Sequence, residues 1–119
     1  MASGFLTTHV LDTGRGKPAA GLNISLYRLE DTGQIHIADM QTNDDGRTDA
    51  PILPQDSFSP GRYMLIFHAG AYLDAHYDEL PEPKFLDEVP IIFGMAEAQS
   101  HYHVPLLLSP YGYSTYRGS

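Results

Sequence analysis

The chain of 119 residues has no cysteine and no tryptophan, and it contains no long uninterrupted apolar run. The missing cysteine excludes disulfides, thiolate zinc sites and a cysteine nucleophile. A membrane-spanning helix needs about 20 apolar residues in succession, so the sequence argues against a membrane protein. The first residues lack the basic start and apolar centre of a secretory signal. We therefore expect a cytoplasmic protein.

Basic residues are also scarce. Seven Lys and Arg stand against fifteen Asp and Glu, which gives a formal net charge of −8 and a pI near 4.9. A protein that binds nucleic acid needs clustered cations to replace the counterions of the phosphates, and this chain lacks them. Local groups of positive residues stand out in such an acidic chain, and they occur around Arg47 and at residues 116–119. Nucleic acid is therefore excluded as the expected partner.

Short β-like segments separated by turns account for most of the chain. Apolar patterning predicts strands at residues 5–12, 23–29, 34–42, 61–68, 89–93, 101–109 and 113–119. Residues 14–21 and 51–60 are predicted loops, and residues 69–79 form the only plausible helix. With 42% apolar residues the chain can fill one core, so we expect a single domain over residues 1–119. An antiparallel sandwich is the predicted architecture.

Alternation along the strands predicts the direction of three histidines. In residues 5–12, a period of two places His9 on the face opposite Val10. His101 and His103 are two positions apart in one strand, so they share a face at a spacing of about 6 to 7 Å. One strand thus presents two imidazoles side by side.

A strong turn follows the predicted strand at residues 34–42. Within that strand, alternation places Ile37 opposite Ala38. The next residues, 43–46, read Asn-Asp-Asp-Gly, and Asp-Gly tolerates the positive φ angles of tight turns. Arg47 is therefore predicted to begin an extended segment at the end of a sheet.

Each of these polar residues also has a structural explanation when taken alone. A single strand histidine is more often hydrogen-bonded or solvated than catalytic, and an arginine after a turn is usually solvated. On this ground we assign no role to His36, His68 or His76. Only a pattern that joins several segments can favour a functional site.

Three separated blocks resemble the transthyretin-like 5-hydroxyisourate hydrolase family. They are LTTHVLDT with GKPA at residues 6–13 and 16–19, TNDDGR at 42–47, and HYHVPLLLSPYGYSTYRGS at 101–119. The resemblance runs in the family's order from the first predicted strand to the last residue. The closing Tyr-Arg-Gly-Ser separates these hydrolases from the hormone carrier transthyretin.

This resemblance implies an all-β fold, a transthyretin-like (prealbumin-type) sandwich of two four-stranded sheets with one short helix. It also implies a homotetramer, a dimer of dimers, with sites at the dimer–dimer interface. The implied reaction is hydrolysis of 5-hydroxyisourate, a purine-derived product of urate oxidation, to 2-oxo-4-hydroxy-4-carboxy-5-ureidoimidazoline. It implies neither a cofactor nor a metal.

The resemblance also places functional residues. The catalytic residues of the family fall at His9, Arg47 and His103. The residues that we expect to bind substrate are Tyr116, Ser114, Arg117 and Ser119. Hydrolysis of a ring acyl bond by water needs a base, an oxyanion partner and an acid. We assign His103 as the base and His9 as its partner, roles that the sequence alone leaves interchangeable, and Arg47 as the oxyanion partner.

Two other functions remain open at this point. A carrier would have the same sandwich without chemistry, but it would need an apolar channel, which these polar residues disfavour. A zinc enzyme could use His9, His101 and His103 as a three-histidine site with an open position for water. Persistence of activity after chelation would count against zinc.

Overall fold

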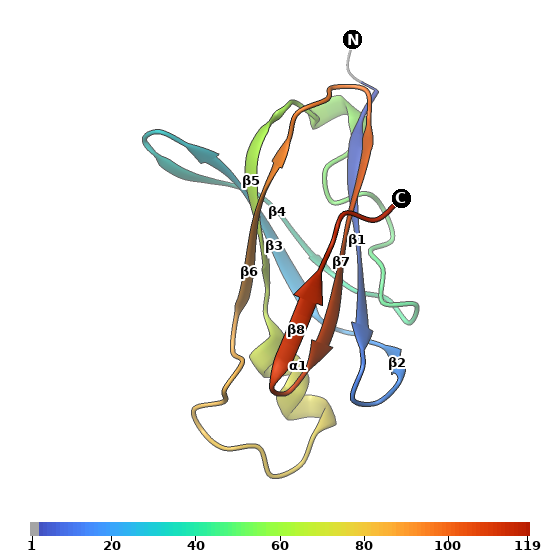
Figure 1. Cartoon of the computed structure of the whole chain (residues 1–119), viewed down its shortest axis with the longest axis vertical. Coiled ribbons are helices and arrows are strands. Elements are labelled where there is room, and N and C mark those ends of the chain that lie inside the picture. Colours follow the sequence, from blue (N-terminus) through green and yellow to red (C-terminus); the bar gives the residue numbers. More distant parts are fainter. Residues whose placement is uncertain (1–2) are drawn as a thin grey trace.

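The computed structural model describes residues 3–119 as two stacked β-sheets with one short α-helix near one end (Figure 1). One sheet has the strand order β2-β1-β7-β8, and the other has the order β4-β3-β5-β6. The expected all-β sandwich of two four-stranded sheets is confirmed. Met1 and Ala2, which the expected domain includes, lie outside the described residues.

The element boundaries follow the sequence pattern with two exceptions. The first sheet contains β1 (Phe5–Asp12), β2 (Lys17–Pro18), β7 (His101–Ser109) and β8 (Gly112–Thr115). The second contains β3 (Asn23–Glu30), β4 (Gly33–Gln41), β5 (Gly61–Phe67) and β6 (Val89–Met95). A 3-10 turn, Gln55–Ser57, precedes β5, and α1 (Ala69–His76) follows it. The prediction of a loop at residues 14–21 was wrong at Lys17–Pro18, which form β2 and pair with β1. The last strand was predicted to reach the terminus, but it ends at Thr115.

No helix within residues 3–119 combines the length and apolar character needed to cross a membrane.

The core lies between the inner faces of the two sheets. Along β1, Leu6 and Val10 are fully buried, while His9 and its outward neighbours are only partly buried. Facing residues from the other sheet include Leu26 and Leu65, both fully buried. Each such side chain contributes about 1.5–3 kcal/mol when it is removed from water. Because the inner faces hold the fold together, the outer faces can carry function.

A β-bulge corrects the predicted alternation in β4. The pairing steps from Leu26↔Ala38 to Tyr27↔His36, which leaves Ile37 as an extra residue. As a result Ile37 and Ala38 both pack against the core, although alternation placed them on opposite faces. Beyond the bulge the β3–β4 hairpin projects from the sandwich (Figure 1, teal). The bulge thus shifts by one position the alternation of side chains between the two faces of the sheet on either side of Ile37.

The first and seventh strands are neighbours and run parallel. Their register pairs Phe5 with His101, and Thr7 with His103. Residues that are paired in this way point to the same face of a sheet. The outer face of the first sheet therefore gathers Thr7, His9, His101 and His103 from opposite ends of the chain.

Candidate active site

The site is built where the turn at residues 43–46 meets the outer face of the first sheet. Gly46 has a φ of 76°, and a Cβ at this position would lie 2.4 Å from the carbonyl oxygen of Val10. Only glycine fits this close approach without strain. The turn predicted from Asp-Gly is confirmed. Arg47, which follows it, is not part of a strand and pairs with His9 through one isolated β-bridge. The turn thereby places a guanidinium beside a strand histidine.

Arg47 and His103 line one open cavity of about 340 Å³. The remaining residues around it are Thr7, Thr8, Thr48, Asp49, Ala50, Pro51, His101 and Ser119. Ser119 reaches this cavity because Gly118 forms a bridge with His103, and its amide donates to the carbonyl of His103 at 2.7 Å. A Cβ at Gly118 would lie 2.5 Å from Cδ2 of His103, so a glycine is required there. The end of the chain is thus packed directly against the imidazole.

Burial and the charge of Arg47 favour the neutral form of both histidines. Burial, and then the charge of Arg47, lowers the pKa of His103 below its ordinary value, with smaller effects from His101 and His9. Burial and Arg47 likewise lower the pKa of His9, and Asp45 partly opposes them. A neutral imidazole has a free nitrogen lone pair that can accept a proton. The pair therefore has the protonation state that a general base requires.

The hydroxyl of Thr7 is a member of this group that sequence reasoning missed. Its Oγ1 lies 2.7 Å from Nδ1 of His103 and 2.6 Å from Nε2 of His101. Alternation along β1 places Thr7 on the same face as His9, but it gives no distance to β7. Only the parallel register of β1 and β7 brings the hydroxyl to the two rings.

Three of the expected substrate-binding residues lie away from this cavity in the single chain. Tyr116 and Arg117 line a different cavity of about 440 Å³ beside β6. The guanidinium carbon of Arg117 lies 4.3 Å from the centre of the Tyr102 ring, a cation–π contact. Ser114 lies on β8, where it pairs with Leu107 and is exposed. Of the four expected residues, only Ser119 borders the cavity that His103 and Arg47 share.

The geometry also bears on a zinc site. The rings of His101 and His103 are 6.1 Å apart between centroids, and both are hydrogen-bonded to Thr7. Within residues 3–119, no three His, Asp or Glu side chains come together in an arrangement that could hold a metal ion. The described residues therefore give no support to the three-histidine site.

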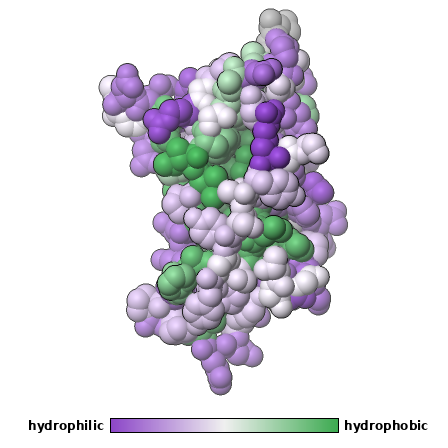
Figure 2. All heavy atoms as spheres, in the orientation of Figure 1, coloured by the Kyte–Doolittle hydropathy of each residue, from purple (hydrophilic) through white to green (hydrophobic). Residues whose placement is uncertain are grey.

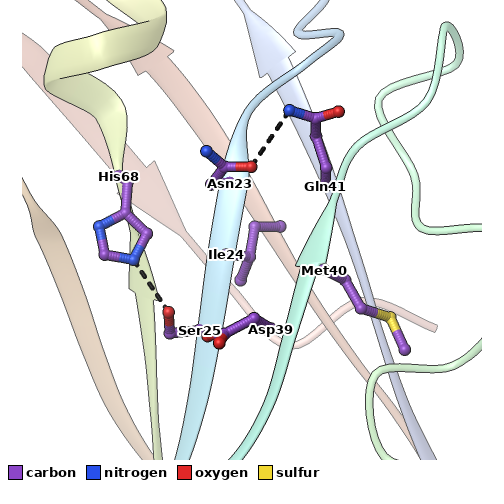
Figure 3. A pocket seen from close by; sticks show the side chains of 7 residues that line it. All are labelled: Asn23, Ile24, Ser25, Asp39, Met40, Gln41 and His68. Atoms are coloured by element: carbon purple, nitrogen blue, oxygen red, sulfur yellow. Dashed lines mark hydrogen bonds between the residues drawn. The ribbon is translucent and has the colours of Figure 1, made fainter.

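A second hollow lies on the outer face of the other sheet, with a volume of about 710 Å³ (Figure 3). Here His68 Nε2 lies 2.9 Å from the hydroxyl of Ser25, and His68 Nδ1 lies 3.0 Å from a carboxylate oxygen of Glu88. The order of hydroxyl, imidazole and carboxylate is that of a serine hydrolase triad. Whether these three residues could act as a triad depends on the groups around Ser25.

Those surroundings oppose acyl transfer at Ser25. The residue lies in the middle of the sheet, paired with Asp39 on one side and Ile66 on the other, so its backbone is engaged by both neighbours. Hydrogen bonds from His36 and then from Ser25 lower the pKa of Asp39, which keeps a negative charge beside the hydroxyl. An oxyanion needs donors and positive charge instead. The side chain of Glu88 is also 58% exposed.

The chain is similar to known proteins of one family. A family model described as the HIUase/Transthyretin family matches residues 6–118. The 5-hydroxyisourate hydrolase of Mesorhizobium japonicum is 63% identical over 116 residues, which cover 98% of this chain and 93% of that protein. The family match includes His9, Arg47 and His103 and ends one residue before Ser119.

Two solved structures have the same fold. The crystal structure of an (S)-allantoin synthase superposes with a TM-score of 0.92 at 44% identity, covering 99% of this chain, which spans only 44% of that one. The 5-hydroxyisourate hydrolase of Klebsiella pneumoniae superposes with a TM-score of 0.78 at 34% identity, covering 100% of this chain and 96% of that one. With a family match over nearly its whole length, the chain belongs to the HIUase/Transthyretin family.

Proposed function

We propose that the chain hydrolyses 5-hydroxyisourate to 2-oxo-4-hydroxy-4-carboxy-5-ureidoimidazoline. The observation that carries this proposal is the polar cavity in which the imidazole of His103 and the guanidinium of Arg47 face one small space. Family membership and the names of the relatives point to the same substrate. The proposed class of reaction is hydrolysis of a cyclic amide by water.

In the proposed mechanism His103 is the general base. Its lowered pKa leaves the ring neutral near pH 7, so a ring nitrogen can take a proton from water as the oxygen attacks the acyl carbon. Negative charge then grows on the acyl oxygen, and Arg47 stabilises it with N–H donors. The proton held on His103 passes to the ring nitrogen as the carbon–nitrogen bond breaks. His9, bridged to Arg47, orients the water or the substrate.

We also propose that the protein acts as a homotetramer, a dimer of dimers, with its sites at the dimer–dimer interface. Exposed residues at the edge strands support association: Ile92 on β6, Tyr113 on β8 and Tyr116 just after β8 are 57%, 45% and 60% exposed. Figure 2 shows apolar side chains on this face of the molecule. Association of copies would cover these residues and enclose the open cavity. The expected roles of Ser114, Tyr116 and Arg117 in substrate binding depend on this assembly.

The remaining parts of the proposal concern extent and location. Residues 1–119 act as one domain, supported within residues 3–119 by the single core that both sheets share. The proposed location is the cytoplasm, which cell fractionation would test. Native mass spectrometry of the purified protein tests the tetramer, and a stable monomer that retains full activity would contradict it.

The decisive experiment follows freshly generated 5-hydroxyisourate by ultraviolet absorbance with and without the protein. Spontaneous decay of the substrate gives the baseline. The proposal expects disappearance of the substrate to accelerate in proportion to protein concentration and to continue over many turnovers. A carrier without chemistry would leave the decay unchanged or slow it by binding. Treatment with a chelator is expected to leave the rate unchanged.

A further inference from the structure

The outer face of the first sheet holds one hydroxyl between two imidazole rings. Thr7 Oγ1 lies 2.6 Å from Nε2 of His101 and 2.7 Å from Nδ1 of His103. These distances are at the short end of the range for hydrogen bonds between nitrogen and oxygen. The parallel register fixes the arrangement, because Thr7 lies directly opposite His103. His101 is held from its other side by Phe5, whose ring stacks on it at 4.1 Å.

Counting hydrogens restricts how these three groups can be protonated. A threonine hydroxyl carries one hydrogen and two acceptor lone pairs, so it can donate to at most one ring nitrogen, and at least one of the two nitrogens must donate to it. If both nitrogens donated, Nδ1 of His103 would carry a hydrogen, as it does in the first of the two arrangements that follow. In the first arrangement, Nδ1–H of His103 donates to Thr7, and Thr7 donates to His101. In the second arrangement both bonds are reversed, which leaves the hydrogen of a neutral His103 on Nε2.

The charges around His103 favour the first arrangement. The groups that face the ring are His9 from β1, His101 from β7, and Arg47, Asp49 and Ser119, which border the cavity. Of Arg47 and Asp49, only Arg47 is among the groups that shift the pKa of His103, and a cation interacts more favourably with a ring nitrogen lone pair than with an N–H group. The first arrangement leaves the free lone pair on Nε2, the ring nitrogen that Thr7 does not contact. The second would present an N–H group there.

We propose that Thr7 is a positioning residue that keeps Nδ1 of His103 protonated and Nε2 free to act as the base. This inference rests on the proposed hydrolase function. His101 completes the arrangement, because its Nε2 accepts the hydrogen that Thr7 donates. The pair Thr7 and His101 therefore selects the tautomer of the catalytic ring.

The arrangement persists through the proton transfer. Before the reaction, the neutral ring donates from Nδ1 to Thr7, and Nε2 is empty. When water gives its proton to Nε2, hydroxide adds to the acyl carbon and His103 becomes an imidazolium. The imidazolium still donates from Nδ1 to the same oxygen, and Thr7 still donates to His101. No group has to rotate, and the Nε2 proton then passes to the leaving nitrogen.

The test compares Thr7→Val, which removes the hydroxyl at nearly constant volume, with Thr7→Ser, which keeps it. Thr13→Val is a matched control, since the Thr13 hydroxyl bonds the backbone of β7 at Leu108 and no histidine. We expect Thr7→Val to lower kcat by about 10-fold or more while KM changes by less than about 2-fold, on the scale of an impaired general base. Thr7→Ser and Thr13→Val should stay within about 2-fold of wild type.

Nitrogen-15 NMR of the histidines gives a second readout that does not depend on turnover. We expect the wild-type and Thr7→Ser proteins to have the neutral His103 protonated at Nδ1, and Thr7→Val to have a mixture of tautomers. Wild-type protein with the hydrogen on Nε2 of neutral His103 would overturn the inference, whatever the folding of the variants. So would a folded Thr7→Val protein with wild-type kcat and an unchanged tautomer.

The two levels of proposal can fail separately. Protonated Nδ1 in a wild-type protein that does not accelerate decay of 5-hydroxyisourate would support the hydrogen-bond arrangement and overturn the proposed reaction. An active wild-type protein in which Thr7→Val behaves as Thr7→Ser would support the reaction and overturn the role of Thr7.

Discussion

Two histidines on opposite outer faces of the sandwich share a hydrogen bond with a strand hydroxyl, yet their surroundings differ in charge. His103 lies 2.7 Å from Thr7, and His68 lies 2.9 Å from Ser25. The charged neighbour that acts on His103 is the guanidinium of Arg47. His68 instead contacts the carboxylate of Glu88 at 3.0 Å. The two sites are alike in hydrogen bonding and opposite in the sign of the nearby charge.

A hydroxyl–imidazole contact does not by itself make a hydrolytic site. Attack on an acyl carbon creates negative charge on oxygen, and that charge needs donors or cations within reach. Arg47 meets this need next to His103. Near His68, the carboxylates of Asp39 and Glu88 oppose it. The comparison therefore supports the first sheet as the place of the proposed chemistry, and each of the following experiments tests this.

The largest expected effect comes from removing a catalytic group. His103→Asn or Arg47→Gln should lower kcat/KM for 5-hydroxyisourate by about 100-fold or more, the scale of one lost acid–base or oxyanion group. His68→Asn is the matched control on the other face and should stay within about 2-fold of wild type. Steady-state kinetics on proteins of equal assembly state provide the measurement. A large loss in His68→Asn with little loss in His103→Asn would reverse the comparison.

The next effect is on stability, and it concerns the inner side of β1, whereas the proposed active site lies on its outer side. The buried carboxylate of Asp12 accepts hydrogen bonds from the hydroxyls of Tyr72 and Tyr77 at 2.7 and 2.6 Å. Burial, and then Asp12, raises the pKa of both tyrosines to about 12, so they remain donors. Asp12→Ala leaves these hydroxyls without their acceptor and should lower the free energy of unfolding by about 1–3 kcal/mol.

Chemical denaturation measures this change, and the folded Asp12→Ala protein should keep its kcat/KM. An unchanged free energy of unfolding would show that Asp12 does not tie β1 to α1. A large loss of activity in the folded variant would instead link the inner side of the strand to the site.

A smaller effect is expected from Tyr116→Phe, which removes one hydroxyl. In the single chain Tyr116 lies in the cavity beside β6, away from His103. If assembly brings this hydroxyl to the substrate, its loss should raise KM by about 3- to 10-fold, equivalent to one net hydrogen bond. Tyr111→Phe, another exposed tyrosine, is the control. Identical kinetics for the two variants would remove Tyr116 from the binding residues.

The smallest expected effect is a shift in the titration of the site. Arg47 lowers the pKa of His103 and of His9, so Arg47→Gln should raise both toward the ordinary value. The base works in its neutral form, which is present above its pKa, so residual activity should decline at a higher pH than in wild type. NMR titration of the ring protons measures the shift, with Glu88→Gln as the control. A lower or unchanged pKa for His103 in Arg47→Gln would contradict the assigned electrostatics.

Much of the site could be predicted because period-two alternation is a local property of a strand. It placed His9 outward on β1, and it placed His101 and His103 together on β7, where their rings lie 6.1 Å apart. The Asp-Gly turn likewise predicted the bend before Arg47, since the positive φ of Gly46 depends on backbone sterics alone.

What could not be predicted depends on pairing between distant segments. The contact of Thr7 with His103 follows from the register of β1 against β7, which no local pattern contains. The bulge beside Ile37 is set by how β4 pairs with β3, so alternation alone misplaced Ala38. The strand β8 ends at Thr115, and this turns Tyr116 and Arg117 toward β6 in the single chain.

The parallel pairing of β1 with β7 has a consequence for biosynthesis. The hydroxyl of Thr7 and the imidazole of His103 are separated by 96 positions in the chain. The bridge to His103 is formed by Gly118, the last residue but one of the sequence. A ribosome delivers the chain from its N-terminus, and such distant contacts form late in folding. A nascent chain that still lacks its final residues therefore lacks the backbone contact of Gly118 with His103, although His9, Arg47 and His103 are already present.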